Sequence, residues 1–96
     1  MNLALLKYIK SFTDGRIRIR HPALHRQATA DIAVQRMGAV PGIERVESNT
    51  VSGSLLILYD ARALGKEDLI PMGEAWAAYF NAVVAGVAAE PPKVDV

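Results

Sequence analysis

The chain has 96 residues, a formal net charge of +1 and no cysteine. This length suits one domain, and the 51% of hydrophobic and 22% of charged residues are typical of a folded chain. The composition excludes disulfides, thiolate metal sites and binding to nucleic acid by bulk positive charge, and it fits a reducing compartment such as the cytoplasm.

The first predicted elements are a short helix and a strand. Residues 3–12 place apolar side chains around lysines, which favours a short amphipathic helix, with a strand as the alternative. The turn residues "TDG" follow, and "RIRIR" at 16–20 then alternates strictly. Such alternation predicts a strand that is half buried in a sheet, with its isoleucines on one face and its arginines on the other.

A helix, two strands and a long helix complete the chain. Apolar residues recur at helical spacing from about 24 to 39, after a proline at 22 and before the turn "PG". Strands are predicted at 43–48 and 54–60, joined by the turn-rich "NTVSG". The last helix is predicted at 66–89, where "EPP" stops it. Its longest apolar run is shorter than the roughly 20 residues that span a bilayer, so we expect no transmembrane segment.

These elements predict an α+β fold of the ferredoxin-like, split βαβ type. Without its first helix the order is βαββα, which lacks the last strand of that fold. Right-handed crossovers place strand 16–20 beside strand 54–60, with strand 43–48 outside. The missing strand must then come from the tail, the N-terminal segment or another chain. We expect a helical extension at 1–14, a core at 15–70 and the long helix at 66–89.

Three segments, "GRIRIRHP", "AVPGIERVE" and "SGSLLILYDARALGKEDLI", resemble the heavy-metal-associated domain family in order and spacing. The resemblance covers about residues 15–70 and implies a ferredoxin-like fold. The family usually carries copper or zinc on two cysteines of a methionine-threonine-cysteine-x-x-cysteine loop. Counted back from the "PG" turn, those cysteine positions fall on Arg26 and Thr29. Thiolate delivery of soft metals is therefore not implied for this chain.

Cysteine-less relatives suggest a different role. Members of the family without cysteine occur at the N-terminus of transport ATPases or as small companion proteins. Some, associated with iron-handling compartments, resemble a pattern of arginine, eight residues, threonine, two residues and arginine. Arg20 and Thr29 match that pattern here, whereas Ile32 stands at its last position. The resemblance therefore implies a companion of a metal system, with iron among the candidate metals.

The segment 20–29 allows two interpretations. In the first it binds an anion or an acidic partner, because strand arginines lie beside the free N–H groups at the start of a helix. The residues of this binding surface are Arg16, Arg18, Arg20, Arg26 and Thr29. In the second, His21 and His25 share a helix face and hold Zn, Ni or Fe ions. Two ligands are few for a metal, and Arg26 opposes a cation. A solvated strand face, with arginine stems over apolar carbons, is the bland alternative to both.

The last helix predicts self-association. It carries a stripe of small residues beside its large apolar stripe, and a helix that is apolar on two sides needs burial on two sides. The predicted interface of a homo-oligomer consists of Trp76, Ala78, Tyr79, Ala82 and Gly86.

Together these patterns predict a non-enzymatic binding or assembly module without a cofactor. It would be a companion or regulator of a metal transport or storage system, cytoplasmic, and at a membrane only through a protein partner such as a metal-transport ATPase. The alternative is a direct binder of a hard or borderline divalent metal ion through its histidines. No catalytic pattern is present, and strand 16–20 lacks the aromatic residues that stack on RNA bases.

Overall fold

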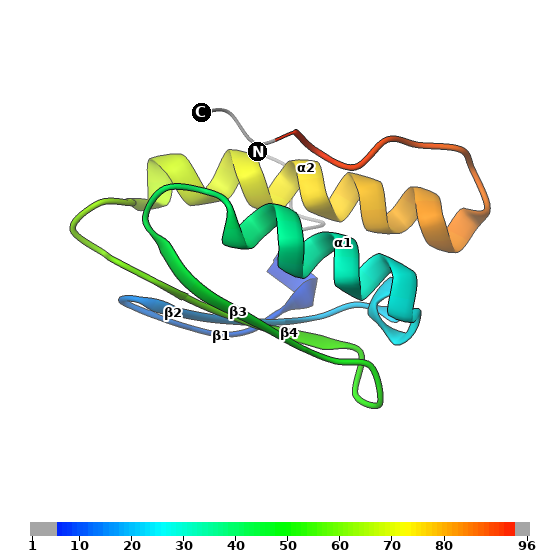
Figure 1. Ribbon diagram of the computed structural model, residues 1–96, viewed down its shortest axis with the longest axis horizontal. Coiled ribbons are helices and arrows are strands. Elements are labelled where there is room, and N and C mark those ends of the chain that lie inside the picture. Colours follow the sequence, from blue (N-terminus) through cyan, green and yellow to red (C-terminus); the bar gives the residue numbers. More distant parts are fainter. Residues whose placement is uncertain (1–5, 94–96) are drawn as a thin grey trace.

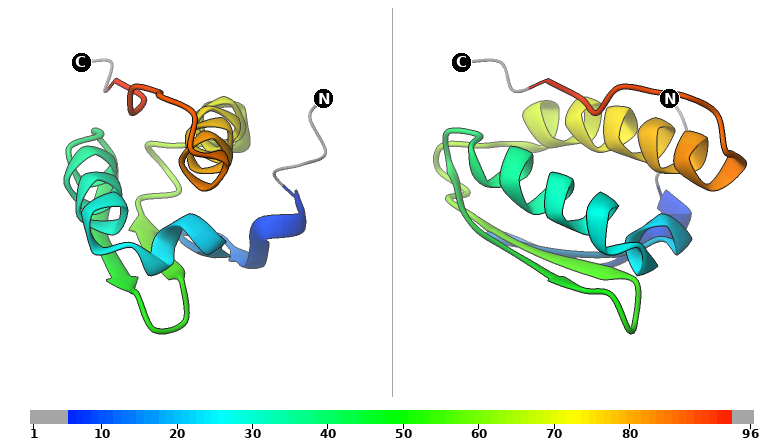
Figure 2. Two further views of the ribbon diagram at one scale, coloured as in Figure 1. Left: turned by 90° about the vertical axis from the view of Figure 1, so that its right-hand side faces the viewer. Right: turned by 45° about the vertical axis from the view of Figure 1, so that its right-hand side comes forward.

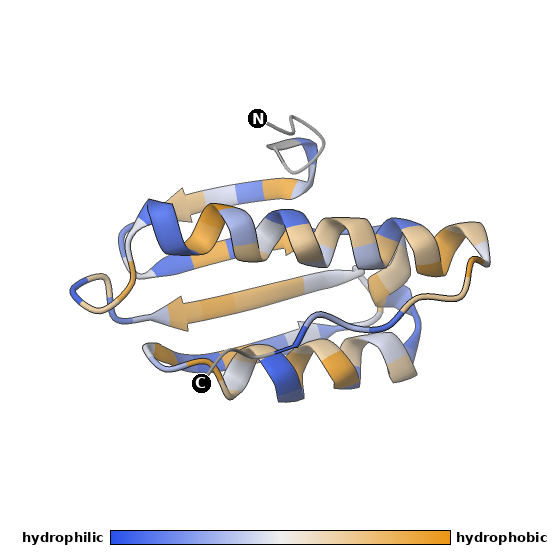
Figure 3. Ribbon diagram, turned by 90° about the horizontal axis from the view of Figure 1, so that it is seen from above, coloured by the Kyte–Doolittle hydropathy of each residue, from blue (hydrophilic) through white to orange (hydrophobic). Residues whose placement is uncertain are grey.

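The computed structural model describes residues 6–93 and places one four-stranded antiparallel sheet beneath two helices (Figure 1). The elements are the 3-10 helix η1 (Leu6–Tyr8), β1 (Ile9–Thr13), β2 (Arg16–Arg20), the 3-10 helix η2 (Pro22–His25), α1 (Gln27–Gly38), β3 (Ile43–Asn49), β4 (Ser54–Tyr59) and α2 (Lys66–Ala85). The strand order in the sheet is β1-β2-β4-β3. Viewed from above, α1 lies over the β3 side of the sheet and α2 over the β1–β2 side (Figure 3). The segment after α2 returns across the helices, where Arg36 Nη1 donates a hydrogen bond of 3.3 Å to the carbonyl of Pro92 (Figure 2).

The pairing of the three core strands agrees with the predicted order, because β2 pairs with β4 and β3 lies outside β4. The predicted N-terminal helix is wrong for the described residues, since Ile9–Thr13 form β1 and only Leu6–Tyr8 are helical. Residues 3–5 of that prediction lie outside the described part of the chain. The alternative prediction, a strand, is correct for this segment. Without β1, the strand β2 would present a row of unpaired backbone groups at the sheet edge.

The missing strand thus comes from the N-terminal segment. Only Asp14 and Gly15 separate β1 from β2, and Gly15 has a φ of +85°, as a tight hairpin turn requires. The two strands pair antiparallel from Thr13 and Arg16 at the turn to Ile9 and Ile19, with one irregularity in register between Ile9 and Ser11. The observed α+β architecture is compatible with a ferredoxin-like fold whose edge strand precedes the core instead of following it.

Both helices differ at one end from the predicted bounds. The helix predicted from about residue 24 begins as η2, and α1 starts only after Arg26, whose backbone is extended. The last helix ends at Ala85 and not at residue 89. Gly86 adopts a φ of 72° and its N–H bonds to the carbonyls of Ala82 and Val83, so glycine and not the later prolines ends the helix.

The core lies between the helices and one face of the sheet. Ile17 of β2 and Leu55, Ile57 and Tyr59 of β4 point toward it. Trp76 and Phe80 of α2 and Met37 of α1 close it from above, together with Leu24 of η2. Because Leu24 is fully buried, the turn between β2 and α1 belongs to the core as much as the regular elements do.

Replacing Leu24 with alanine tests this part of the core. We expect the free energy of unfolding to fall by about 2–5 kcal/mol, because the change removes apolar contacts and leaves a cavity. Urea unfolding followed by circular dichroism measures the loss. Val51→Ala is the control, since Val51 is 90% exposed and its change should stay within about 0.5 kcal/mol. Equal effects of the two changes would contradict the placement of Leu24.

Candidate functional site

The turn η2 lies where the family's metal loop is expected, between β2 and α1, and His21 begins it. His21 is only 2% exposed. Its Nδ1 accepts a hydrogen bond of 3.0 Å from the backbone N–H of Ala23, and its Nε2 lies 2.8 Å from Oδ1 of Asn81. Since an amide oxygen only accepts, Nε2 carries the proton and donates to Asn81. His21 therefore caps the turn with one nitrogen and joins it to α2 with the other.

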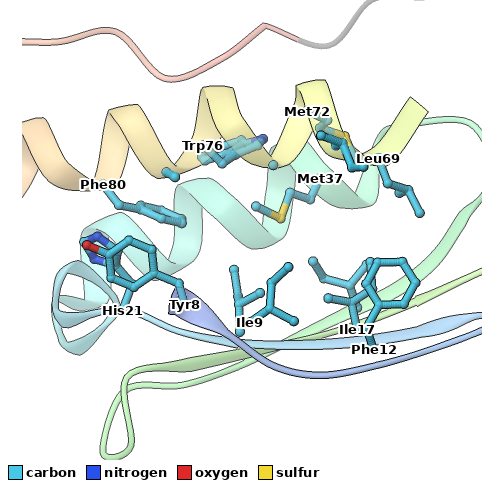
Figure 4. Close-up of a pocket in the computed structure, with 15 residues that line it drawn as sticks. Tyr8, Ile9, Phe12, Ile17, His21, Met37, Leu69, Met72, Trp76 and Phe80 are labelled. Carbon is cyan, nitrogen blue, oxygen red and sulfur yellow. The ribbon is translucent and has the colours of Figure 1, made fainter. Parts of the chain in front are cut away.

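Aromatic rings surround this imidazole. The ring centroids of Tyr8 and Phe80 lie 4.3 Å and 5.3 Å from that of His21, and Figure 4 shows the three rings at one end of a pocket. The hydroxyl of Tyr8 donates to the same Oδ1 of Asn81 over 3.2 Å. Burial lowers the pKa of His21, the Asn81 hydrogen bond raises it in part, and the nearby Lys7 charge lowers it further. The ring is therefore neutral at neutral pH.

His25 faces the other way. Its Nδ1 lies 2.8 Å from the backbone carbonyl of Thr50, in the turn between β3 and β4, and donates a hydrogen bond to it. The expected pairing of His21 and His25 on one helix face is wrong, because His21 has an extended backbone before a 3-10 turn and no α-helix spans both residues. One imidazole is directed at α2 and the other at the β3–β4 turn.

This donor set does not fit a resident metal. Both ring nitrogens of His21 already have hydrogen-bond partners within the protein. In the stretch 6–93, no three or more histidine, aspartate or glutamate side chains come close enough to hold an ion. A metal at His25 would depend on one imidazole next to the charge of Arg26. The geometry therefore supports a structural role for His21.

Of the five residues predicted to bind an anion or an acidic partner, four are exposed and one is buried. Arg16, Arg18, Arg20 and Arg26 are exposed. Thr29 is not available to a partner, because α1 begins only after Arg26 and turns Thr29 inward, where it is 5% exposed. The sequence prediction for Thr29 is corrected accordingly.

Both helices lie on one side of the sheet (Figure 1). Three of these arginines alternate on β2 with core-facing isoleucines, so they point to the other, uncovered face. Directly paired residues point to the same face, and Arg16, Arg18 and Arg20 pair with Leu58, Leu56 and Ser54 of β4. On β3, Arg45 and Glu47 pair with Leu58 and Leu56 and form a salt bridge of 2.5 Å. We call Arg16, Arg18, Arg20 and Arg45 the arginine face. Its three β2 members form no ion pair with any residue between 6 and 93.

The predicted oligomer interface is wrong for its two aromatic members. Trp76 and Tyr79 are 4% and 9% exposed and pack edge to face in the core of the chain itself, with ring centroids 5.7 Å apart. Ala78 and Gly86 are exposed and Ala82 is half-buried. Self-association through the small residues of α2 stays a prediction.

Comparison with known proteins identifies the family. The family model described as heavy metal associated domain 2 matches residues 6–72. The chain belongs to this family. The resemblance inferred from the sequence is thus confirmed, and the match includes β1, which sequence analysis had placed outside the core. Searches of curated proteins and of solved structures found no match. No helix within the described range is long and apolar enough to cross a membrane.

Sequence reasoning missed Tyr8 and Asn81 as partners of His21. Asn81 gave one signal, because it is the polar residue that interrupts the apolar run of the last helix. Tyr8 gave no such signal. Its place beside His21 depends on the strand β1 that directly follows it, and that segment was predicted as a helix.

The buried imidazole predicts how stability depends on pH. Because the pKa of His21 is lowered from its ordinary value of 6.5, the unfolded chain binds more protons than the folded one near and below that pH. The contribution of neutral His21 is complete above its unfolded pKa and is lost as the pH falls toward its folded pKa. We expect the urea midpoint to fall between about pH 7.5 and about pH 5.5.

His21→Gln should flatten this pH dependence. His25→Gln is the matched control, because the His25 side chain is directed at the β3–β4 turn and not at Asn81. Urea titrations of the two variants across the same pH range provide the comparison. An unchanged slope in His21→Gln would show that another group controls the titration.

Proposed function

We propose that this heavy-metal-associated domain is a non-enzymatic binding module of a metal transport or storage system, and that it contacts an acidic protein partner through its arginine face. Membership of the family suggests the association with metals. The observation that carries the proposal is the row of exposed arginines on β2, which no helix covers and no described acid neutralises.

The spacing of the arginine face suits a protein surface. Alternate residues of a strand lie about 6.6–6.8 Å apart on one face, so Arg16, Arg18 and Arg20 form a regular row. Guanidinium groups bind carboxylates with two parallel hydrogen bonds. A partner with acidic side chains on one strand or helix face would meet this row along its length.

The neighbouring strand adds apolar contact. Leu56 and Leu58 of β4 lie directly beside Arg18 and Arg16 and are half-buried. Protein interfaces combine such an apolar centre with a polar rim, and arginine is enriched in them. The positions of this face on β2 and β4 carry arginine, leucine and serine and no aromatic ring, which favours a protein over RNA.

The direct binding of a metal ion is the second candidate, and the site geometry does not favour it. Both ring nitrogens of His21 form hydrogen bonds within the protein, and His25 points to the turn between β3 and β4. We therefore assign the association with metal to the partner and not to a cation held by this chain.

Removing the row of charges tests the proposal. The variant with Arg16, Arg18 and Arg20 changed to glutamine should lose a metal-transport or metal-storage protein that the unchanged domain retains from cells that make it. We expect retention to fall roughly ten-fold or more, because several charge-assisted hydrogen bonds are lost together. Quantitative mass spectrometry of the co-purified proteins measures it.

The matched control removes the same charge elsewhere. Arg62, Lys66 and Lys93 are exposed and lie outside the strands that carry the arginine face, so their joint change to glutamine should leave retention unaltered. Equal loss in both variants would indicate a bulk charge effect. Retention of the same metal-handling proteins by both variants would also contradict the proposal.

Calorimetric titration distinguishes the two candidates. We expect no saturable heat when Zn²⁺, Ni²⁺ or Fe²⁺ is added to the unchanged protein at micromolar concentration, because the histidines do not converge. Saturable uptake that His25→Ala abolishes would overturn this expectation and support direct binding of the metal.

A further inference from the structure

A cleft lies between α2 and the β1–β2 hairpin, on the opposite side of the sheet from the arginine face. It holds a cavity of about 70 Å³ (Figure 4). The hairpin contributes Ile9, Phe12 and Ile17 to its walls, and α2 contributes Leu69, Trp76 and Phe80. The two walls of the cleft are thus almost wholly apolar.

An apolar occupant suits this cleft better than water does. The cavity has room for several water molecules, since one needs only about 10–15 Å³ of such space. A buried water also needs two to four polar partners. The polar groups at the Tyr8 and His21 end are already engaged, because both nitrogens of His21 and the Tyr8 hydroxyl form hydrogen bonds within the protein. At the other end the apolar rim is open to solvent, because Phe12 and Ile70 are 36% and 39% exposed.

The shape of the cleft suits a chain. It extends along β2 from the ring of His21 to Ile17 and Phe12, as the close-up shows (Figure 4). Four residues of a strand span about 13 Å, which matches an extended chain of about ten carbon atoms.

The charges at the His21 end are positive. The ammonium group of Lys7 lies 5.5 Å from the centre of the Tyr8 ring, and the exposed amide of Asn81 adjoins the Tyr8 hydroxyl. The segment 6–13 contains Lys7 and Lys10 and no acidic residue. This end of the cleft therefore favours an anionic head group.

We propose that the cleft binds a medium-chain fatty acid, with its alkyl chain between α2 and the hairpin and its carboxylate beside Lys7 and Tyr8. This site is independent of the arginine face and goes beyond the proposed function. Ligand sites of this kind combine apolar walls with a few polar groups that orient the ligand.

The single tryptophan of the chain, Trp76, lines the cleft and reports on its occupancy. Decanoate that carries bromine at its last carbon should quench the fluorescence of Trp76 with a saturable, one-to-one curve, and plain decanoate should reverse the quenching. The absence of saturable quenching up to millimolar concentration would overturn the proposal.

Two variants test the two ends of the ligand. Lys7→Gln should weaken binding about three- to five-fold, as the loss of one exposed ion pair does, whereas the control Lys66→Gln should not. Ala77→Leu should fill the cleft and abolish saturable quenching, with circular dichroism as a check on folding. If that variant fails to fold, Gly73→Leu replaces it, since Gly73 also lines the cleft. Equal affinity in all variants, or equal affinity for decanol and decanoate, would contradict the assignment.

Discussion

A buried imidazole joins three parts of the chain that lie far apart in sequence. His21 orders the turn η2 through the N–H of Ala23, binds α2 through Asn81 and packs against the tilted ring of Tyr8 from the N-terminal segment. A buried polar group without a partner costs about 1–3 kcal/mol. The neutral ring therefore specifies how the turn, the last helix and the start of β1 meet.

This junction leaves His21 no free ring nitrogen for a metal ion. A metal-binding imidazole needs a free ring nitrogen, and both nitrogens of His21 serve the fold. The arginine face, through which we propose that a partner binds, lies on the other face of the strand that precedes the turn. Since the side chains of β2 alternate, Ile17 and Ile19 enter the core while the arginines between them face outward. One short strand thus supplies both the core and the charged surface.

The strand β2 and its arginines could be predicted from the sequence because strict alternation is a local signal. The same holds for the pairing of β2 with β4, which follows from the handedness of the crossovers. The strand β1 could not be predicted from the sequence, since a short run of apolar residues and lysines suits a helix equally well. The backbone edge of β2, which needs a pairing strand, favours a strand over a helix here. This edge forms only when the sheet folds.

The errors at the site have a related cause. The inward position of Thr29 depends on where α1 starts, and the extended backbone at Arg26 sets that start. On α2 the sequence shows a large and a small apolar stripe without showing which one faces the sheet. The structure buries Trp76 and Tyr79, as expected from the larger apolar area that they remove from water. The His21–Asn81 contact joins residues 60 positions apart, beyond the reach of any periodicity.

The position of α2 also follows from the junction. The rings of Tyr8 and Phe80 pack at a tilt against His21 between the hairpin and the helix, with their centroids 4.3 Å and 5.3 Å from that of His21. These rings connect the two layers at one end of α2. Farther along α2, Trp76, Met72 and Leu69 face the hairpin across the cleft. Protein interiors are usually packed as densely as organic crystals. Phe80 belongs both to the ring cluster around His21 and to the wall of the cleft. Replacing it with a smaller side chain would therefore remove apolar contacts from the junction and enlarge the cleft at the same time.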